Sequence, residues 1–167
     1  GWAGTGKDSA CAFTIPYDVR RPNSSSYAMV DQKAVLEAAR VIAVVGCSNE
    51  PFRPSYGIAR YLKQVGYDVV PVNPKQRQCH GETCYASIGA VPYDVEIDIV
   101  NIFRNARYTA DMVREVVARV RRTGERPVIW TQLGVSSPEA ERLAEEAGLP
   151  YVRNRCILVE RERLLVD

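Results

Sequence analysis

The segment 46–57 combines the residue types that bind an anion through the main chain. It reads GCSNEPFRPSYG and follows the apolar run 41–45. Gly46 lets the main chain approach a phosphate closely, and Arg53 can add a bidentate contact. Ser55 stands where a helix is expected to begin, and the first N–H groups of a helix lack partners within it. The segment predicts an anion site at a strand-to-helix turn. A plain connecting loop, with Ser55 as the helix cap, is an equal alternative.

A lysine follows the second apolar run, at a position that contacts the ribose in nucleotide-binding folds. The run 68–73 ends at Asn73 and is followed by Pro74 and Lys75. NAD-binding folds usually place an acidic residue near here, for the ribose 2′-OH. Lys75 reverses that charge and suits a phosphate on the ribose, which both coenzyme A and NADP carry. The alternative is a solvated lysine after a proline turn.

Further polar and aromatic residues follow two later apolar runs. Phe103 and Arg104 come directly after the run 97–102, and Gln132 and Leu133 follow the next one. In open α/β sheets, ligands bind beyond the carboxyl ends of the strands, where the strand order reverses. We therefore expect these side chains at the same rim as the first loop.

The elements that position these residues alternate regularly after residue 30. Strands are expected at 41–46, 68–73, 97–102, 128–131 and 150–153, with a short extended piece near 83–86, and helices at 31–40, 55–65, 108–122, 137–147 and 156–165. Strands that are apolar on both faces indicate a parallel sheet covered on both sides. The predicted fold is α/β: a Rossmann-like, doubly wound, mainly parallel sheet with helices on both faces.

Composition limits the class of protein. The 167 residues carry 22 Lys and Arg against 20 Asp and Glu, and this mixed charge argues against nucleic-acid binding. No apolar run is long enough to span a membrane. Five cysteines in an uneven pattern indicate free thiols in a reducing compartment.

We expect one domain over 31–167 in the cytoplasm. Residues 1–30 form an extended arm or the remnant of a tag or targeting segment, and an organellar location follows if that segment is processed.

Three patterns that suggest catalysis or a metal fail on closer reading. Residues 1–8 match the glycine and lysine spacing of a P-loop, but no strand precedes them and Asp8 replaces the Ser or Thr that holds Mg²⁺. Cys79, His80 and Cys84 lack the further ligands of a zinc site. His80 is the only histidine, in a predicted surface turn, so the sequence offers no credible nucleophile–base pair. We expect no metal site and no catalytic residue.

Six separate blocks of sequence resemble one family, the stand-alone coenzyme A-binding domain proteins, relatives of the N-terminal domain of the succinyl-CoA synthetase α subunit. The blocks are VIAVVGCS at 41–48, RPSYGIARYL at 53–62, GYDVVPVNPK at 66–75, DIVNIFR at 98–104, VIWTQLGV at 128–135 and RNRCILVE at 153–160. The synthetase relatives carry a catalytic histidine in a second domain, which this sequence does not contain.

The resemblance implies where coenzyme A would lie. The pyrophosphate would be lined by residues of the first loop, namely Gly46, Ser48, Asn49, Arg53, Ser55, Tyr56 and Gly57. The nucleotide end would lie near Lys75, with Asn73 before it. The cofactor would be bordered by Phe103 and Arg104, with Gln132 and Leu133 on the opposite rim. Cys47 departs from the family, which often has a small apolar residue there, and its thiol is expected to alter loop packing.

Three functions remain open at this point. The first is non-covalent binding of coenzyme A or an acyl-CoA, without catalysis and with no protein partner identified. The second is an NADP-dependent oxidoreductase, against which the first loop lacks the G-x-G-x-x-G pattern. The third is an interaction protein that kept the fold without its ligand, because a fold alone does not decide function.

Overall fold

The computed structural model describes residues 30–166. The expected arm over residues 1–29 and the segment with P-loop spacing lie outside the described residues. Val30, at the boundary of the expected arm, is buried against the core.

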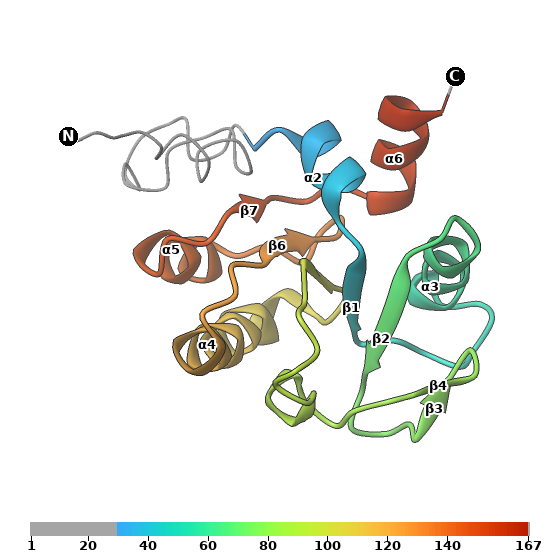
Figure 1. Cartoon of the computed structure of the whole chain (residues 1–167), viewed down its shortest axis with the longest axis horizontal. Coiled ribbons are helices and arrows are strands. Elements are labelled where there is room, and N and C mark those ends of the chain that lie inside the picture. Colours follow the sequence, from blue (N-terminus) through green and yellow to red (C-terminus); the bar gives the residue numbers. More distant parts are fainter. Residues whose placement is uncertain (1–29, 167) are drawn as a thin grey trace.

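Five parallel strands form one sheet in the order β2-β1-β5-β6-β7 (Figure 1). They are β1 (Val41–Val45), β2 (Asp68–Val72), β5 (Ile99–Ile102), β6 (Val128–Thr131) and β7 (Tyr151–Val152). The chain leaves β1 toward β2 on one side and continues from β5 on the other, so the strand order reverses at β1. Val45 pairs with Val72 and with Ile102. These three strands therefore end level with one another.

Helices cover both faces of this sheet. They are α2 (Gln32–Ala38), α3 (Pro54–Gln64), α4 (Ala106–Thr123), α5 (Pro138–Glu146) and α6 (Ile157–Leu165). Helix α6 contacts α2 and α3 on one face, whereas α4 packs against α5 on the other (Figure 1). The predicted doubly wound α/β fold is confirmed.

Local sequence explains where these helices begin and end. Asn105 caps α4 by accepting a hydrogen bond from a main-chain N–H, and Ser137 does the same for α5. Pro54 and Pro138 occupy the first turns of α3 and α5, where a missing N–H costs nothing. Gly124 ends α4 in the left-handed conformation, with φ of 77°.

The crossover from β2 to β5 contains no long helix. It holds the hairpin strands β3 (Gln78–Cys79) and β4 (Glu82–Thr83) and the 3-10 helix η3 (Ile88–Ala90). The expected extended piece near 83–86 corresponds to β4 and to Tyr85, which bridges Val72 at the end of β2. The crossover thus brings β3 and β4 beside the carboxyl end of the sheet.

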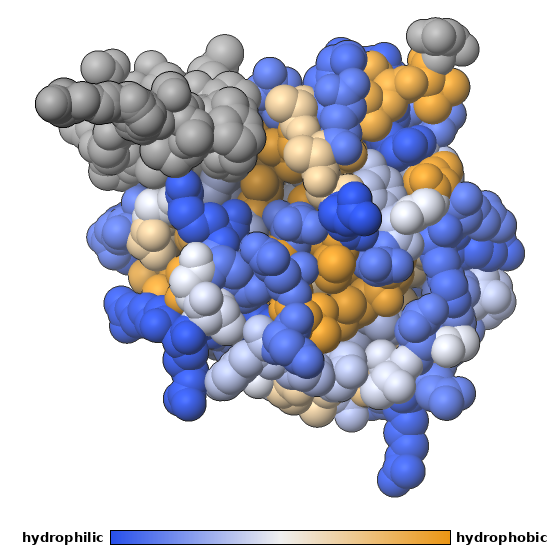
Figure 2. All heavy atoms as spheres, viewed as in Figure 1, coloured by the Kyte–Doolittle hydropathy of each residue, from blue (hydrophilic) through white to orange (hydrophobic). Residues whose placement is uncertain are grey.

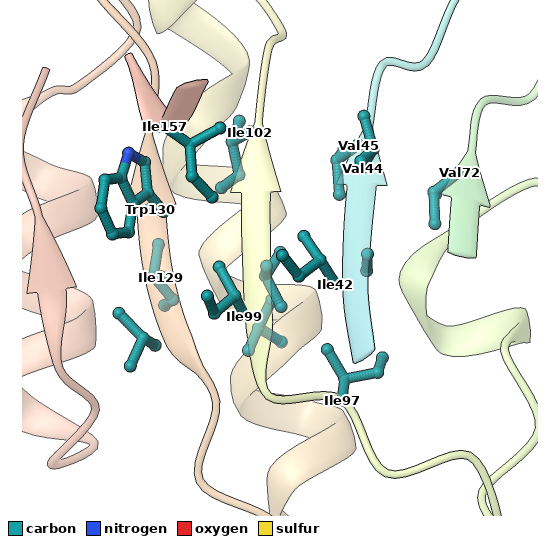
Figure 3. Packing of buried hydrophobic residues seen from close by; sticks show 14 of the residues in the cluster. Ile42, Val44, Val45, Val72, Ile97, Ile99, Ile102, Ile129, Trp130 and Ile157 are labelled. Atoms are coloured by element: carbon teal, nitrogen blue, oxygen red, sulfur yellow. The ribbon is translucent and has the colours of Figure 1, made fainter. Parts of the chain in front are cut away.

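The core lies between the sheet and its helices. Isoleucine and valine side chains from four strands lie next to one another, and Trp130 and Ile157 close the cluster near α6 (Figure 3). Full burial of such a side chain contributes about 1.5–3 kcal/mol. On the face shown in Figure 2, hydrophilic residues surround a group of hydrophobic residues near the middle. No helix among residues 30–166 is long and apolar enough to cross a membrane.

Candidate functional site

A cavity of about 450 Å³ opens at the carboxyl ends of β1, β2 and β5. Its walls are the loops that follow these strands. The β1 loop leads to α3 on one face of the sheet, and the β5 loop leads to α4 on the other. Because the two connections diverge, they leave a hollow where the strand order reverses, which is the usual ligand position in this class of fold.

The cavity brings together most of the residues singled out from the sequence. Those lining it are Gly46, Ser48, Arg53, Ser55, Asn73, Lys75, Phe103 and Arg104. Five further lining residues were missed: Glu50, Pro54, Pro74, Gln76 and Asn105. Each of these lies within two positions of a predicted residue, so a prediction that took in every residue of each loop would have included them.

Gly46 occupies a position that requires glycine. Its φ of +89° is in the left-handed region, and a Cβ there would lie 3.4 Å from Cδ of Arg104 and 3.5 Å from Cβ of Phe103. Its N–H donates to the carbonyl of Val72, 2.7 Å away. Gly46 therefore lets the β1 loop pass close to the β5 loop across the floor of the cavity.

Ser55 anchors the β1 loop rather than capping α3. Its hydroxyl accepts a hydrogen bond from the N–H of Ser48 at 3.1 Å and donates to the carbonyl of Gly46 at 3.0 Å. The N-cap residue of α3 is Arg53, which makes no side-chain cap bond. The alternative of Ser55 as a simple helix cap is therefore wrong, because the side chain turns back into its own loop.

Two asparagines tie the β1 loop to the segment after β2. Asn73 donates from Nδ2 to the carbonyl of Cys47 at 2.8 Å and accepts from the N–H of Lys75 at 2.8 Å. Asn49 donates to Oε1 of Gln76 at 2.7 Å and to the carbonyl of Gln78 at 2.8 Å. Asn49 does not line the cavity and instead connects its walls.

Three cationic side chains, Arg53, Lys75 and Arg104, line the cavity and differ in the groups that they contact. Arg53 forms an ion pair with Glu50, with Nε and Oε1 3.2 Å apart. The guanidinium of Arg104 lies 4.6 Å from the ring centroid of Tyr108, a favourable cation–π distance. Within residues 30–166, neither Arg104 nor Lys75 forms an ion pair with a carboxylate. The cavity therefore carries excess positive charge and suits an anionic ligand.

The remaining predicted residues lie outside the cavity lining. The ring of Tyr56 contacts that of His80, with centroids 4.5 Å apart, and Gly57 lies within α3, where a Cβ would meet nothing within 4 Å. Leu133 is exposed on the loop after β6. Gln132 is buried and accepts hydrogen bonds from Asn101 Nδ2 at 3.2 Å and from a main-chain N–H of α6 at 2.9 Å. Its oxygen thus holds α6 against the sheet.

Buried thiols lie beneath the β1 loop. Cys47, Cys79 and Cys84 are all buried, and none of them is in a disulfide among the described residues. Burial raises the pKa of Cys47 and raises that of Cys84 to about 11, and the neighbouring Cys79 contributes to both shifts. The thiol of Cys47 is packed into the core, so it does not face a ligand in the cavity. Cys156, at the start of α6, is half-buried.

Comparison with known proteins identifies related chains. A model of the CoA binding domain family matches residues 40–162. Uncharacterized protein YneT of Bacillus subtilis is 32% identical over 127 residues, which cover 76% of this chain and 89% of YneT. A solved structure of a hypothetical protein from Pyrococcus horikoshii has a TM-score of 0.74 and 37% identity, covering 81% of this chain and 90% of that one.

Part of a longer enzyme subunit matches as well. The α subunit of ADP-forming acetate–CoA ligase II from Pyrococcus furiosus is 26% identical over 117 residues, which cover 70% of this chain. The match spans only 24% of that subunit. The likeness therefore concerns about a quarter of the length of that subunit. Together these matches confirm the resemblance found in the sequence blocks.

Proposed function

Because the chain belongs to the CoA-binding domain family, we propose that its cavity binds coenzyme A or an acyl-CoA non-covalently and that this domain catalyses no reaction on it. The observation that carries the proposal is the set of three cations, Arg53, Lys75 and Arg104, around one cavity where the strand order reverses. Coenzyme A carries a diphosphate and a 3′-phosphate, which cationic side chains bind through charge-assisted hydrogen bonds.

The chemistry of the lining favours the nucleotide half of the ligand. Apart from Pro54, Pro74 and Phe103, the residues that line the cavity are glycine, hydroxyl, amide or charged residues. Such a surface suits phosphates and a ribose better than an acyl chain, which would lose affinity against polar groups. We therefore expect coenzyme A and its short acyl thioesters to bind with similar affinity.

Two side chains that could take part in catalysis, His80 and Cys47, are both poorly suited to it. His80 Nε2 lies 2.9 Å from the main-chain carbonyl of Tyr56, an interaction that engages this nitrogen with the main chain. Burial raises the pKa of the Cys47 thiol, and only the thiolate is a strong nucleophile. Neither residue meets the requirement for an activated nucleophile beside a general base.

Direct identification of the ligand tests the proposal. The purified protein is denatured and the released small molecules are analysed by mass spectrometry, and calorimetric titrations are run with coenzyme A, acetyl-CoA and NADPH. We expect coenzyme A or an acyl-CoA in the released fraction and saturable binding of both thioester and free thiol forms. Preferential binding of NADPH, with turnover of a small carbonyl substrate, would establish the oxidoreductase instead. Binding of none of the three would favour the ligand-free scaffold.

A further inference from the structure

Glu50 places a negative charge in a cavity that otherwise suits an anion. Of the described residues that line the cavity, it is the only acidic one. Its Oε1 lies 3.2 Å from Nε of Arg53, and both side chains are more than half exposed. A ligand phosphate that contacts Arg53 must therefore replace this carboxylate or bind beside it.

The main chain holds Glu50 and Arg53 together. The N–H of Arg53 donates to the carbonyl of Glu50 at 2.9 Å, which closes a turn. The N–H of Glu50 in turn donates to the hydroxyl of Ser48 at 3.0 Å, and Ser48 is itself bound by Ser55. The two charges are thus presented by a fixed turn at the same wall of the cavity, so their pairing does not depend on a mobile loop.

We propose that Glu50 is a built-in competitor for Arg53, which lowers the affinity of the site for a ligand diphosphate and keeps binding readily reversible. This inference rests on the proposed function. Lys75 and Arg104 form no ion pair within residues 30–166, and although Arg104 lies near enough to Glu115 to favour its charged form, neither cation has a carboxylate in direct contact. Glu50 engages Arg53 through Nε, so a ligand phosphate either displaces the carboxylate or binds the remaining guanidinium N–H groups beside it, and in both cases the carboxylate stays near a like charge.

The test is a calorimetric titration of Glu50→Gln with coenzyme A and with dephospho-coenzyme A. The substitution keeps the shape of the side chain and removes its charge. We expect both ligands to bind about fivefold more tightly, because both carry the diphosphate and an exposed ion pair contributes an effect of this size. The gain should shrink at higher salt, which screens exposed charges. It should also shrink when Arg53 is already replaced by Gln.

A matched control separates this effect from a change in net charge. Glu37 is a similarly exposed carboxylate, paired with Lys33 on α2, and it does not line the cavity. Glu37→Gln should leave the affinity for both ligands unchanged. Equal tightening by Glu37→Gln overturns the proposal, as does weaker or unchanged binding by Glu50→Gln, which would mean that Glu50 orients Arg53 for the ligand. A gain undiminished by Arg53→Gln also overturns it. If the unmodified protein binds neither ligand, the proposed function itself fails.

Discussion

The side-chain amide of Asn73 donates a hydrogen bond to the main-chain carbonyl of Cys47, 2.8 Å away. This bond joins the residue after β2 to the loop after β1, and both segments line the cavity. The same asparagine accepts the N–H of Lys75, which fixes the turn that carries the lysine. The position of this cation is therefore set by the β1 loop as well as by its own strand.

Replacing Ser55 with Ala should loosen the β1 loop and weaken ligand binding. The substitution removes the bonds to the N–H of Ser48 and the carbonyl of Gly46 in a buried position. We expect a loss of about 1–2 kcal/mol in the free energy of unfolding, the usual effect of leaving a buried polar group without a partner. Denaturant unfolding and calorimetric titration with coenzyme A measure the two effects.

Ser137→Ala is the control for this prediction. Ser137 caps α5 by accepting a hydrogen bond from the N–H of Ala140 at 3.1 Å, and it does not line the cavity. Its loss should cost about 1 kcal/mol of stability with no change in affinity. If Ser55→Ala weakens binding no more than Ser137→Ala does, the hydroxyl of Ser55 stabilises the fold without shaping the site.

The order of strands and helices could be predicted from the sequence because each apolar run is short and each helix has clear ends. The run 41–45 is followed by a glycine and later by Pro54, and the helix 106–123 ends at Gly124. Such signals depend only on residues that are close in the sequence, so they can be recognised without knowledge of the tertiary structure. The boundaries that differed, such as the strand start at 99 instead of 97, depend on pairing with neighbouring strands.

The site could be predicted less completely, because sequence position does not fix the direction of a side chain. Gln132 follows a strand at the correct rim, yet its amide oxygen is taken up by Asn101 and by the start of α6. Tyr56 is adjacent to a lining residue but turns toward His80. Glu50 was overlooked because a carboxylate is not expected in an anion site. These outcomes depend on contacts between distant segments.

Replacing Arg119 with Met should strongly destabilise the fold. Its side chain is 1% exposed, and the guanidinium forms an ion pair with Glu125 and donates to the carbonyls of Pro92 and Val95 at 2.9 and 2.7 Å. Glu125 also accepts the N–H of Ile97 at 3.0 Å. The substitution leaves the buried carboxylate of Glu125 without its cation and several carbonyls without a donor, so we expect a loss of about 3–5 kcal/mol in denaturant unfolding.

An exposed arginine on the same helix provides the comparison. Arg114 is half exposed and forms ion pairs with Asp111 on α4 and with Glu139 on α5. Arg114→Met should change the unfolding free energy little, because water and salt screen exposed pairs. Similar losses of unfolding free energy in the two variants would mean that helix α4 is sensitive to any change of charge. The buried pair of Arg119 and Glu125 would then contribute no more to stability than an exposed pair.

The cysteines should differ sharply in reactivity. Cys156 is half-buried, whereas Cys47 and Cys84 are buried and their pKa values are raised, that of Cys84 to about 11. Their thiolate fractions therefore stay small until the pH approaches these raised values. We expect iodoacetamide at pH 8 to label Cys156 in the folded protein and the other two only after unfolding. Peptide mapping assigns the label to each cysteine separately, Cys11 included.

The difference in exposure between Cys156 and Cys47 should also decide which thiol forms a mixed disulfide when coenzyme A is present. Diamide treatment in the presence of coenzyme A should form a mixed disulfide at Cys156 rather than at Cys47, and Cys156→Ser should abolish it at that position. An adduct on Cys47 in the folded protein, seen by peptide mapping, would show that the β1 loop opens far enough to expose its thiol. Intact-mass analysis with no added coenzyme A at either residue would remove the hypothesis of a mixed disulfide.

Replacing Lys75 with Ala should distinguish coenzyme A from dephospho-coenzyme A. Lys75 is exposed at the rim of the cavity, and it forms no ion pair in the described part of the chain. We propose that its ammonium pairs with the 3′-phosphate of coenzyme A. We expect the affinity for coenzyme A to fall roughly tenfold, the low end for a hydrogen bond between charged groups, because solvent screens an exposed contact. Dephospho-coenzyme A lacks that phosphate, so its affinity should scarcely change.

Calorimetric titration of both ligands into the unmodified protein and Lys75→Ala completes a double-mutant cycle that isolates the coupling between the ammonium and the phosphate. Lys33→Ala serves as the control, because Lys33 is a lysine on α2 paired with Glu37 and outside the cavity lining. The coupling should decline as salt rises, since the Debye length is about 10 Å at 0.1 M. If both ligands weaken equally in Lys75→Ala, the lysine supports the loop as a whole. The 3′-phosphate must then lie elsewhere, and Arg104 becomes the next residue to replace.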